Sequence, residues 1–172
     1  YPGEVRARYE PDLAFRIGSV DDKRLSATNL GRARVRHCAS PGYVRKYGAP
    51  RAAVDLKSHE CLVVQAEGEP SRWPVPGKKG IEVIPVHGRL RFNSFAMTYA
   101  AALAGLGIGL FPEFACSADL LAKRLVTVLE PSGVEVGAVW LVHPVQRYLA
   151  PRVRKFVELT TARLKCAPWR GE

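Results

Sequence analysis

The chain has 172 residues, of which 47% are apolar, and its 26 Lys and Arg residues exceed its 16 Asp and Glu residues to give a net charge of +10. This length is enough for one domain with a sizeable hydrophobic core. No apolar run approaches the roughly 20 residues that a membrane-spanning helix requires, which argues against a membrane protein.

The cysteines and the first residues indicate the compartment. Four cysteines are scattered along the chain without the paired C-x-x-C spacing of a zinc or redox site; they are Cys38, Cys61, Cys116 and Cys166. Isolated thiols are compatible with a reducing compartment. The opening YPGEVRARYEP lacks the basic and then apolar pattern of a signal peptide. We therefore expect a cytoplasmic protein.

The first half of the chain predicts strands separated by a short helix and by a hairpin or loop. Ser40 and Pro41 are typical of a helix start, and Gly48 is typical of its end. The Pro- and Gly-rich residues 68–80 predict a loop or hairpin. Alternating or apolar segments predict strands at residues 12–18 (DLAFRIG), 33–39 (ARVRHCA), 60–66 (ECLVVQA), 81–86 (IEVIPV) and 88–93 (GRLRFN).

Residues 94–112 (SFAMTYAAALAGLGIGLFP) contain a glycine cluster that raises the question of a nucleotide site. In a dinucleotide site the strand precedes the glycines and the helix follows them. Here the order is reversed: Ser94 is a candidate helix cap, Gly105 ends the helix, and GIGLF continues as a strand before Pro112. Helical spacing predicts one apolar face on this helix, made of Phe95, Tyr99, Ala102, Leu103 and Leu106. The glycines therefore predict a helix-to-strand turn.

The second half of the chain alternates helices and strands. A helix is expected at residues 114–125 with Leu120, Leu121 and Leu125 inward, and short strand residues follow at 126–129. The apolar run at residues 137–144 predicts a strand buried on both faces. The final helix, residues 150–165, is expected to bury Val153, Phe156, Val157, Thr160 and Leu164. This alternation is typical of an α/β protein with a mainly parallel sheet.

No group of residues has the pattern of a reaction centre. The four histidines do not make a set of three or four metal ligands with the neighbouring cysteines, and no serine lies in a G-x-S-x-G motif. We expect no catalytic residues, no metal and no cofactor. Arg32, Arg34 and Arg36 alternate with apolar residues, so in a strand they would share one face. This face is either simply solvated or a stripe that binds an anionic partner.

Three polar residues lie where α/β proteins bind ligands, beyond the carboxyl ends of strands. Arg16 stands in an otherwise apolar strand just before Gly18, and an arginine there is able to bind a carboxylate in a bidentate pair. An outward-facing arginine on a half-exposed strand is the alternative. Asn93 and Ser94 occupy a similar strand-to-helix junction, where simple helix capping is the alternative.

Six segments in this order and spacing resemble the effector-binding domain of LysR-type transcriptional regulators, over residues 12 to about 164. The segments are DLAFRIG, HCASPGYVRKYGAP, DLKSHECLV, RFNSFAMTYAAALAGLGIGLFP, KRLVTVL and VWLVHPVQRYLAPRVRKFVEL. The resemblance implies a fold like the type 2 periplasmic binding proteins, with two Rossmann-like α/β subdomains joined by two crossing strands. Subdomain I would contain residues 1–36 and 141–172, and subdomain II residues 37–140.

The resemblance also implies a ligand and partners. A small metabolite, often an organic acid in this family, would bind in the cleft between the subdomains and change the geometry of a homodimer or homotetramer. DNA would be bound by a winged helix-turn-helix domain outside these residues, and the family's first strand–helix unit likewise has no counterpart here. Residues expected to line the cleft are Arg16, Ile17 and Gly18 on one side, and Asn93 and Ser94 on the other, with Val64, Gln65 and Trp73 as walls.

Three other functions are also compatible with these residues, because one fold serves many functions. The same two-lobed scaffold is used by solute-binding receptors, which require a secretion signal, and by enzymes, which require a converging nucleophile and base. An interaction domain with a vestigial cleft is a third possibility.

Overall fold

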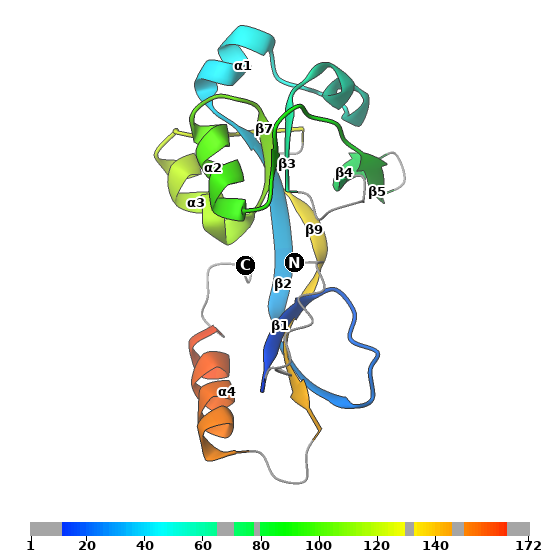
Figure 1. Cartoon of the computed structure of the whole chain (residues 1–172), viewed down its shortest axis with the longest axis vertical. Coiled ribbons are helices and arrows are strands. Elements are labelled where there is room, and N and C mark those ends of the chain that lie inside the picture. The colour runs from blue at the N-terminus through cyan, green and yellow to red at the C-terminus, as the bar shows by residue number, and fades with distance from the viewer. Residues whose placement is uncertain (1–11, 65–70, 78–79, 130–132, 146–149, 165–172) are drawn as a thin grey trace. The chain divides into compact units, whose positions relative to one another are not determined.

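A computed structural model of the chain describes residues 12–64, 71–77, 80–129, 133–145 and 150–164. The chain divides into two compact units, one within Val35–Val134 and the other within Glu4–Arg34 and Glu135–Glu172. The boundaries lie in two long strands, β2 (Leu25–Ala39) and β9 (Val134–Pro144), which therefore contribute residues to both units (Figure 1). No helix in the ranges described is both long enough and apolar enough to cross a membrane.

The main sheet has seven strands in the order β1-β9-β2-β7-β3-β6, with β8 paired to β2 beside this path. The remaining strands are β1 (Ala14–Ile17), β3 (Cys61–Val64), β6 (Arg91–Phe92), β7 (Ile108–Pro112) and β8 (Val126–Val128). β3 is parallel to β6 and β7, whereas β2 is antiparallel to β7 and β8, and β1 is antiparallel to β9. The α/β class is confirmed, but the expectation of a mainly parallel sheet is wrong. Alternating strands and helices do not reveal that long strands pair antiparallel with their neighbours.

The ends of the helices in the first unit follow from local sequence. Helix α1 (Pro41–Tyr47) begins after Ser40, whose hydroxyl accepts a hydrogen bond from the Tyr43 N–H at 3.1 Å, and ends at Gly48, where φ is 78°. Helix α2 (Phe95–Leu103) is followed by Gly105, which has φ of 77°, and then by β7. The predicted helix-to-strand turn is therefore confirmed. A short 3-10 helix, η1 (Ala53–Ser58), precedes β3, and helix α3 (Glu113–Leu121) follows β7 directly.

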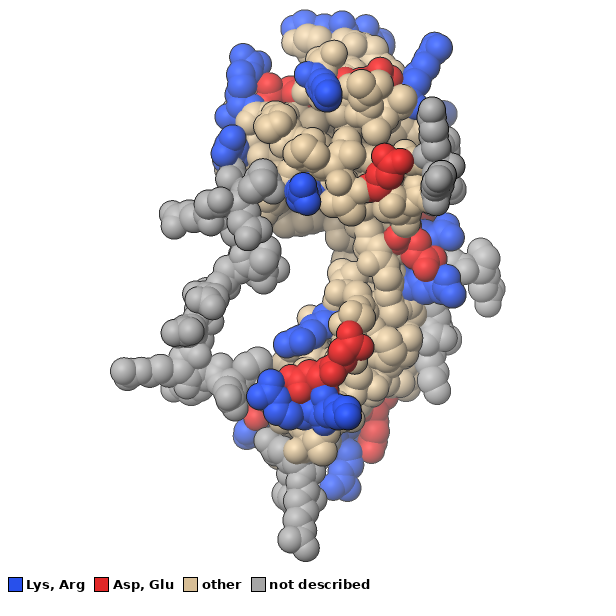
Figure 2. Space-filling model, turned by 90° about the vertical axis from the view of Figure 1, so that its right-hand side faces the viewer, with Lys and Arg blue, Asp and Glu red and all other residues tan. Residues whose placement is uncertain are grey.

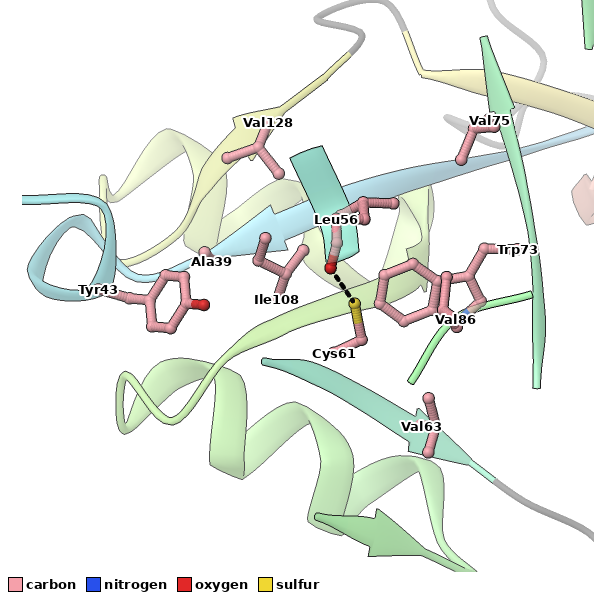
Figure 3. Close-up of a cluster of buried hydrophobic side chains, with 10 residues drawn as sticks. All are labelled: Ala39, Tyr43, Leu56, Cys61, Val63, Trp73, Val75, Val86, Ile108 and Val128. Atoms are coloured by element: carbon pink, nitrogen blue, oxygen red, sulfur yellow. Dashed lines mark hydrogen bonds between the residues drawn. The ribbon is translucent and has the colours of Figure 1, made fainter. Parts of the chain in front are cut away.

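Two hydrophobic clusters cover opposite faces of the sheet in this unit. Successive side chains of a strand point to opposite faces, so Cys61 and Val63 of β3 join one cluster and Leu62 joins the other. The first cluster includes Trp73 and Val75 of β4 (Arg72–Gly77), which forms a two-stranded hairpin with β5 (Gly80–Pro85) (Figure 3). The second contains residues of α2 and α3, which lie on one side of β7 (Figure 1).

The buried faces of α2 and α3 agree with the predicted ones only in part. Ala102 is buried, and Tyr99, Leu103 and Leu120 pack half-buried against the second cluster, as predicted. Helix α2 buries Thr98, Ala101 and Ala102, whereas two residues expected inward, Phe95 and Leu106, are 40% and 49% exposed. Helix α3 ends at Leu121, which is 86% exposed instead of buried, while Leu125 is buried in the chain that follows the helix. Small residues let α2 lie close to the sheet, and the end of α3 at Leu121 breaks the helical spacing on which the prediction relied.

The second unit contains β1, parts of β2 and β9, and helix α4 (Pro151–Leu164). Helix α4 buries Val153, as expected, but Phe156 on its predicted inner face is 46% exposed. Within the run expected to be buried on both faces, only Leu141 and Val142 are buried, and the rest of the run is half-buried. The apolar composition of this strand therefore overstates its burial.

Candidate functional site

The carboxyl end of β1 holds Arg16, Ile17 and Gly18 in a fixed backbone geometry. Arg16 lies opposite Trp140 of β9 in the antiparallel pair. The Gly18 N–H donates to the Ala138 carbonyl at 2.9 Å, and the Trp140 Nε1–H donates to the Gly18 carbonyl at 2.7 Å. Gly18 has φ of +108°, a conformation that favours glycine. Backbone and indole hydrogen bonds therefore hold the end of β1 against β9.

The Arg16 side chain is available at this strand end. Arg16 is exposed, and Ile17 beside it is 56% exposed. Within the described ranges the Arg16 side chain makes no hydrogen bond or ion pair. The pKa of Asp22 is lowered to about 2, chiefly by hydrogen bonds from Arg24, and the charge of Arg16 contributes a smaller part. The guanidinium is thus exposed, and among the described residues its effect is limited to its charge acting on Asp22.

Val64, Asn93 and Ser94 are neighbours at one edge of the first unit. β3 and β6 are parallel with Val64 opposite Phe92, so both strands end together at this edge. Asn93 follows β6 directly and is exposed, and Val64 is 49% exposed. Ser94 occupies the N-cap position of α2, but its hydroxyl makes no capping hydrogen bond. The structure thus brings an amide and a hydroxyl to the carboxyl ends of two parallel strands.

Trp73 lies in a different environment from the other predicted residues. It is only 5% exposed and packs within the first hydrophobic cluster, with its ring 5.7 Å from that of His37. Its proposed role as a wall stays a prediction. Gln65, the remaining predicted residue, lies outside the described residues.

His37 is a buried polar residue that the sequence alone does not distinguish from a surface histidine. Its side chain is 0% exposed, and neither ring nitrogen has a hydrogen-bond partner in the described part of the chain. Burial lowers its pKa to about 4, and the nearby Pro74 backbone has a smaller effect in the opposite direction. The imidazole is therefore neutral at pH 7.

The arginine stripe of β2 is largely engaged with carboxylates. Arg32 pairs with Glu135 at 2.9 Å, and Arg36 pairs with Glu113 at the start of α3. Arg36 and Glu113 are also mostly buried, with 18% and 25% of their side chains exposed. These ion pairs favour the structural interpretation of the stripe over a binding face.

The fold changes the acidity of the described cysteines in different directions. Cys38, Cys61 and Cys116 are free and buried. The Cys38 thiol donates a hydrogen bond to Cys116, and this bond together with burial raises the pKa of Cys38, while burial raises the pKa of Cys61 to about 12, so both thiols are protonated at neutral pH. The same hydrogen bond, helped by the charge of Arg36, lowers the pKa of Cys116 despite its burial. No three His, Cys, Asp or Glu side chains among the residues described lie close enough to hold a metal ion.

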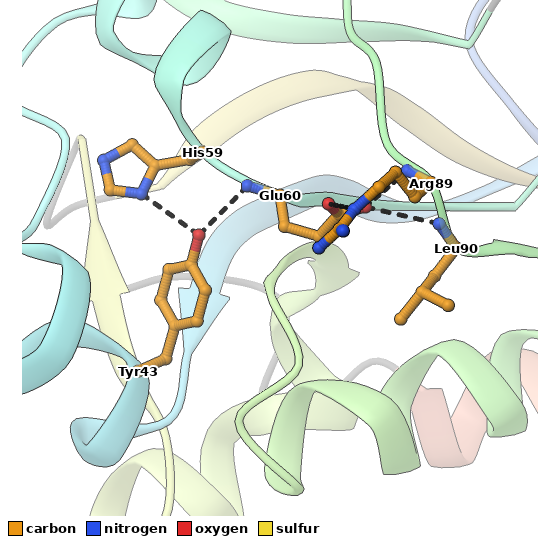
Figure 4. Close-up of polar contacts among 5 residues, drawn as sticks. All are labelled: Tyr43, His59, Glu60, Arg89 and Leu90. Carbon is orange, nitrogen blue, oxygen red and sulfur yellow. Dashed lines mark hydrogen bonds and ion pairs between the residues drawn. The ribbon is translucent and has the colours of Figure 1, made fainter.

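A polar network around Tyr43 is a feature that the sequence reasoning missed (Figure 4). The buried Tyr43 hydroxyl accepts a hydrogen bond from the Glu60 N–H at 3.0 Å and lies 3.1 Å from His59 Nδ1. The Glu60 carboxylate accepts hydrogen bonds from the Arg89 N–H and Nε–H and from the Leu90 N–H. These residues are distant in sequence, so only the folded chain brings them together.

Comparison with known proteins gives a family match and several structural matches. Residues 5–165 match the family model described as LysR substrate binding domain. The regulatory domain of CrgA, a LysR-type transcriptional regulator from Neisseria meningitidis, is similar with a TM-score of 0.76 and 27% identity, covering 89% of this chain and 75% of that one. The regulatory domain of AphB from Vibrio vulnificus gives a TM-score of 0.68 and 26% identity, covering 88% and 74%.

Curated relatives are longer than this chain. An uncharacterized HTH-type transcriptional regulator, YhjC of Escherichia coli (strain K12), is 32% identical over 149 residues, which are 86% of this chain and 50% of that protein. The HTH-type transcriptional regulator DmlR of the same organism is 32% identical over 148 residues, covering 86% and 48%. The chain therefore spans about half the length of the curated relatives it matches.

Proposed function

This chain belongs to the LysR substrate binding domain family, and from that premise we propose that it is the sensing domain of a DNA-binding transcriptional regulator whose effector is a small organic anion. DNA binding is assigned to a helix-turn-helix domain outside these residues, in keeping with relatives that are named HTH-type regulators and are about twice as long. The domain has no catalytic role in this proposal, and it acts in the cytoplasm with the DNA.

The observation that supports an anionic effector most directly is the state of Arg16. An exposed guanidinium stands at the end of a strand whose backbone is fixed by Gly18 and Trp140, and it makes no ion pair within the described ranges. An arginine presents several N–H donors in a planar fork that matches a carboxylate. Ile17, the next residue of the strand, leaves exposed apolar surface at the same strand end. A few placed polar groups next to apolar surface is the composition of small-ligand sites.

Asn93 and Ser94 are proposed to orient the same effector through their amide and hydroxyl groups. Val64, Gln65 and Trp73 are proposed to form the walls of the site around it. The support is the common edge at which Val64, Asn93 and Ser94 lie and the absence of a capping bond at the Ser94 hydroxyl. That these groups and Arg16 meet one ligand between the subdomains is taken from the family resemblance.

Effector binding is proposed to shift the balance between two arrangements of the subdomains and thereby the geometry of a homodimer or homotetramer. A ligand shifts such a balance only by its difference in affinity for the two states. The bound effector would then change how the attached DNA-binding domains hold DNA.

The test is a thermal-shift screen of the 172-residue chain against small aliphatic and aromatic organic acids, followed by calorimetry on any hit. A ligand at 100 times its dissociation constant adds about 2.7 kcal/mol to the free energy of unfolding. For a domain of this size the midpoint rises by roughly 5–10 °C, at about 2–4 °C per kcal/mol. Size-exclusion chromatography with light scattering, with and without the hit, measures the change in oligomer.

The variant Arg16→Ala is expected to weaken binding of an acid about 10- to 100-fold, because a hydrogen bond to a charged group contributes about 1.5–3 kcal/mol. Arg154→Ala on α4, which also removes an exposed arginine from the second unit, is the matched control and should bind normally. Equal affinity of Arg16→Ala and the unmodified chain for the acid would remove Arg16 from the site. An absence of hits for a folded sample would count against an organic acid.

A further inference from the structure

A broad basic hollow lies in the first unit, away from the strand ends proposed above. Its volume is about 1480 Å³, and it is lined by α1 with its cap, by residues 57–60, 89–90 and 103–106, and by residues 123–124. All of these belong to the unit Val35–Val134. Figure 2 shows several Lys and Arg side chains at the upper end of the view, in the first unit.

Positively charged residues far outnumber acidic residues in the lining of the hollow. Of 19 lining residues, six are Lys or Arg and one is acidic; the cations are Arg45, Lys46, Lys57, Arg89, Lys123 and Arg124. Two of the six have carboxylate partners, because Arg89 pairs with Glu60 and Arg124 pairs with Asp119. The other four have no ion pair with a carboxylate within the described ranges. Cations that converge on a concave surface concentrate positive potential there.

The floor of the hollow is fixed by the Tyr43 network. Tyr43 is 4% exposed, and its hydroxyl joins the Glu60 N–H to His59 (Figure 4). Burial acts to raise the pKa of Glu60, but hydrogen bonds from Arg89 and Leu90 outweigh it and lower that pKa. Glu60 is therefore ionised and already engaged. Its carboxylate binds Arg89 and the Leu90 N–H. It therefore does not compete with an anionic ligand for Arg45, Lys46, Lys57 and Lys123.

The rim also presents apolar and aromatic surface beside the charges. Tyr47 is 55% exposed and holds the Lys46 ammonium 4.9 Å from its ring centroid. Leu90 and Leu106 are 36% and 49% exposed in the same hollow. A ligand that matches this surface carries several negative charges and also an apolar or flat body. The volume exceeds the roughly 300–1,000 Å³ of most small-ligand pockets, so it has room for a ligand as large as a nucleotide.

We propose that this hollow is a second ligand site, distinct from the strand-end site, that binds a small phosphorylated metabolite carrying two or more negative charges. Arg45 and Lys57 meet the phosphates from α1 and from the end of η1, and Lys123 meets them from the chain after α3. Tyr47 contacts the organic body. Occupation relieves the repulsion among the cations and therefore stabilises the first unit, whatever occupies the Arg16 site.

Calorimetry and fluorescence anisotropy on the 172-residue chain test this assignment, with pyrophosphate and ATP as probes and acetate as the singly charged control at equal ionic strength. The double variant Arg45→Gln/Lys57→Gln is compared with Arg72→Gln/Arg154→Gln, which removes the same charge from residues outside the hollow. Arg16→Ala is a third arm, because loss of phosphate binding there would assign the anion to the strand-end site instead.

We expect one site for pyrophosphate and for ATP, from which acetate at equal ionic strength does not displace either phosphate probe. The hollow variant should raise the dissociation constant about 3- to 30-fold, since two exposed charge contacts are removed. The control double variant and Arg16→Ala should stay within about twofold of the unmodified chain. If the hollow variant does not fold, Lys123→Gln replaces it and should weaken binding in the same direction.

Three outcomes would overturn the proposal. Equal weakening in both double variants would show a general charge effect without a site. No binding of either phosphate probe would leave only a solvated basic surface. Binding of a labelled DNA duplex that is lost in the hollow variant, without phosphate competition, would make the hollow a contact for DNA instead.

Discussion

Acid should destabilise this protein through His37 well before its carboxylates titrate. The residue is 0% exposed, and its pKa falls from 6.5 to about 4 in the folded chain. Because the folded-state pKa is lowered, the unfolded chain binds the proton first as pH falls. The resulting stabilisation is complete above pH 6.5 and is lost progressively between pH 6.5 and pH 4.

The magnitude follows from the pKa values of the unfolded and folded chain. A tenfold difference in proton affinity corresponds to about 1.36 kcal/mol, so a fall from about pH 7.5 to about pH 5 costs about 2 kcal/mol of unfolding free energy. At a slope of about 2 kcal/mol per molar urea, the urea midpoint should fall by about 1 M. Carboxylates contribute little in this window, because their unfolded pKa values lie near about 4.

Urea unfolding followed by circular dichroism at about pH 7.5 and about pH 5 measures this effect, with His37→Leu as the matched variant. Leucine has a similar volume and does not titrate, and it removes two ring nitrogens that have no hydrogen-bond partner in the described chain. The variant should therefore lose about 2 kcal/mol less than the unmodified chain over the same pH interval. An equal fall in both proteins would refute the assignment of the pH dependence to His37.

Two further pairs of substitutions test caps and burial by the same urea measurement at neutral pH. Ser40→Ala should cost about 1 kcal/mol because the hydroxyl caps the Tyr43 N–H, whereas Ser94→Ala should cost less than about 0.5 kcal/mol because that hydroxyl caps nothing; equal costs would contradict the capping geometry. Leu125→Ala should cost about 2–5 kcal/mol, and Leu121→Ala, at 86% exposed, should stay within about 0.5 kcal/mol. A reversed order would contradict the observed end of α3.

Part of the candidate site could be predicted from the sequence because it depends on strand ends and turn residues. Arg16 lies near the end of β1 and Gly18 follows it, and Asn93 and Ser94 lie between β6 and α2. The residues next to them in the chain predict these positions. The Tyr43 network and the basic hollow could not be predicted in this way. Their members come from five segments between Ser40 and Arg124, and no short-range pattern links them.

The sequence by itself determined the order of the main helices and strands and the ends of α1 and α2, but not that β2 begins at Leu25 or that α3 ends at Leu121. Helix ends depend on residues within one turn, such as Ser40 with Pro41 at the start of α1 and the left-handed Gly105 after α2. Their effect can therefore be predicted from the local sequence. Only the tertiary structure decided which faces are buried, as exposed Leu121 and buried Thr98 show. It also decided the mixed direction of the sheet and the gathering of cations around the Tyr43 floor. Burial and charge depend on residues far apart in the chain, and these meet only when the chain folds.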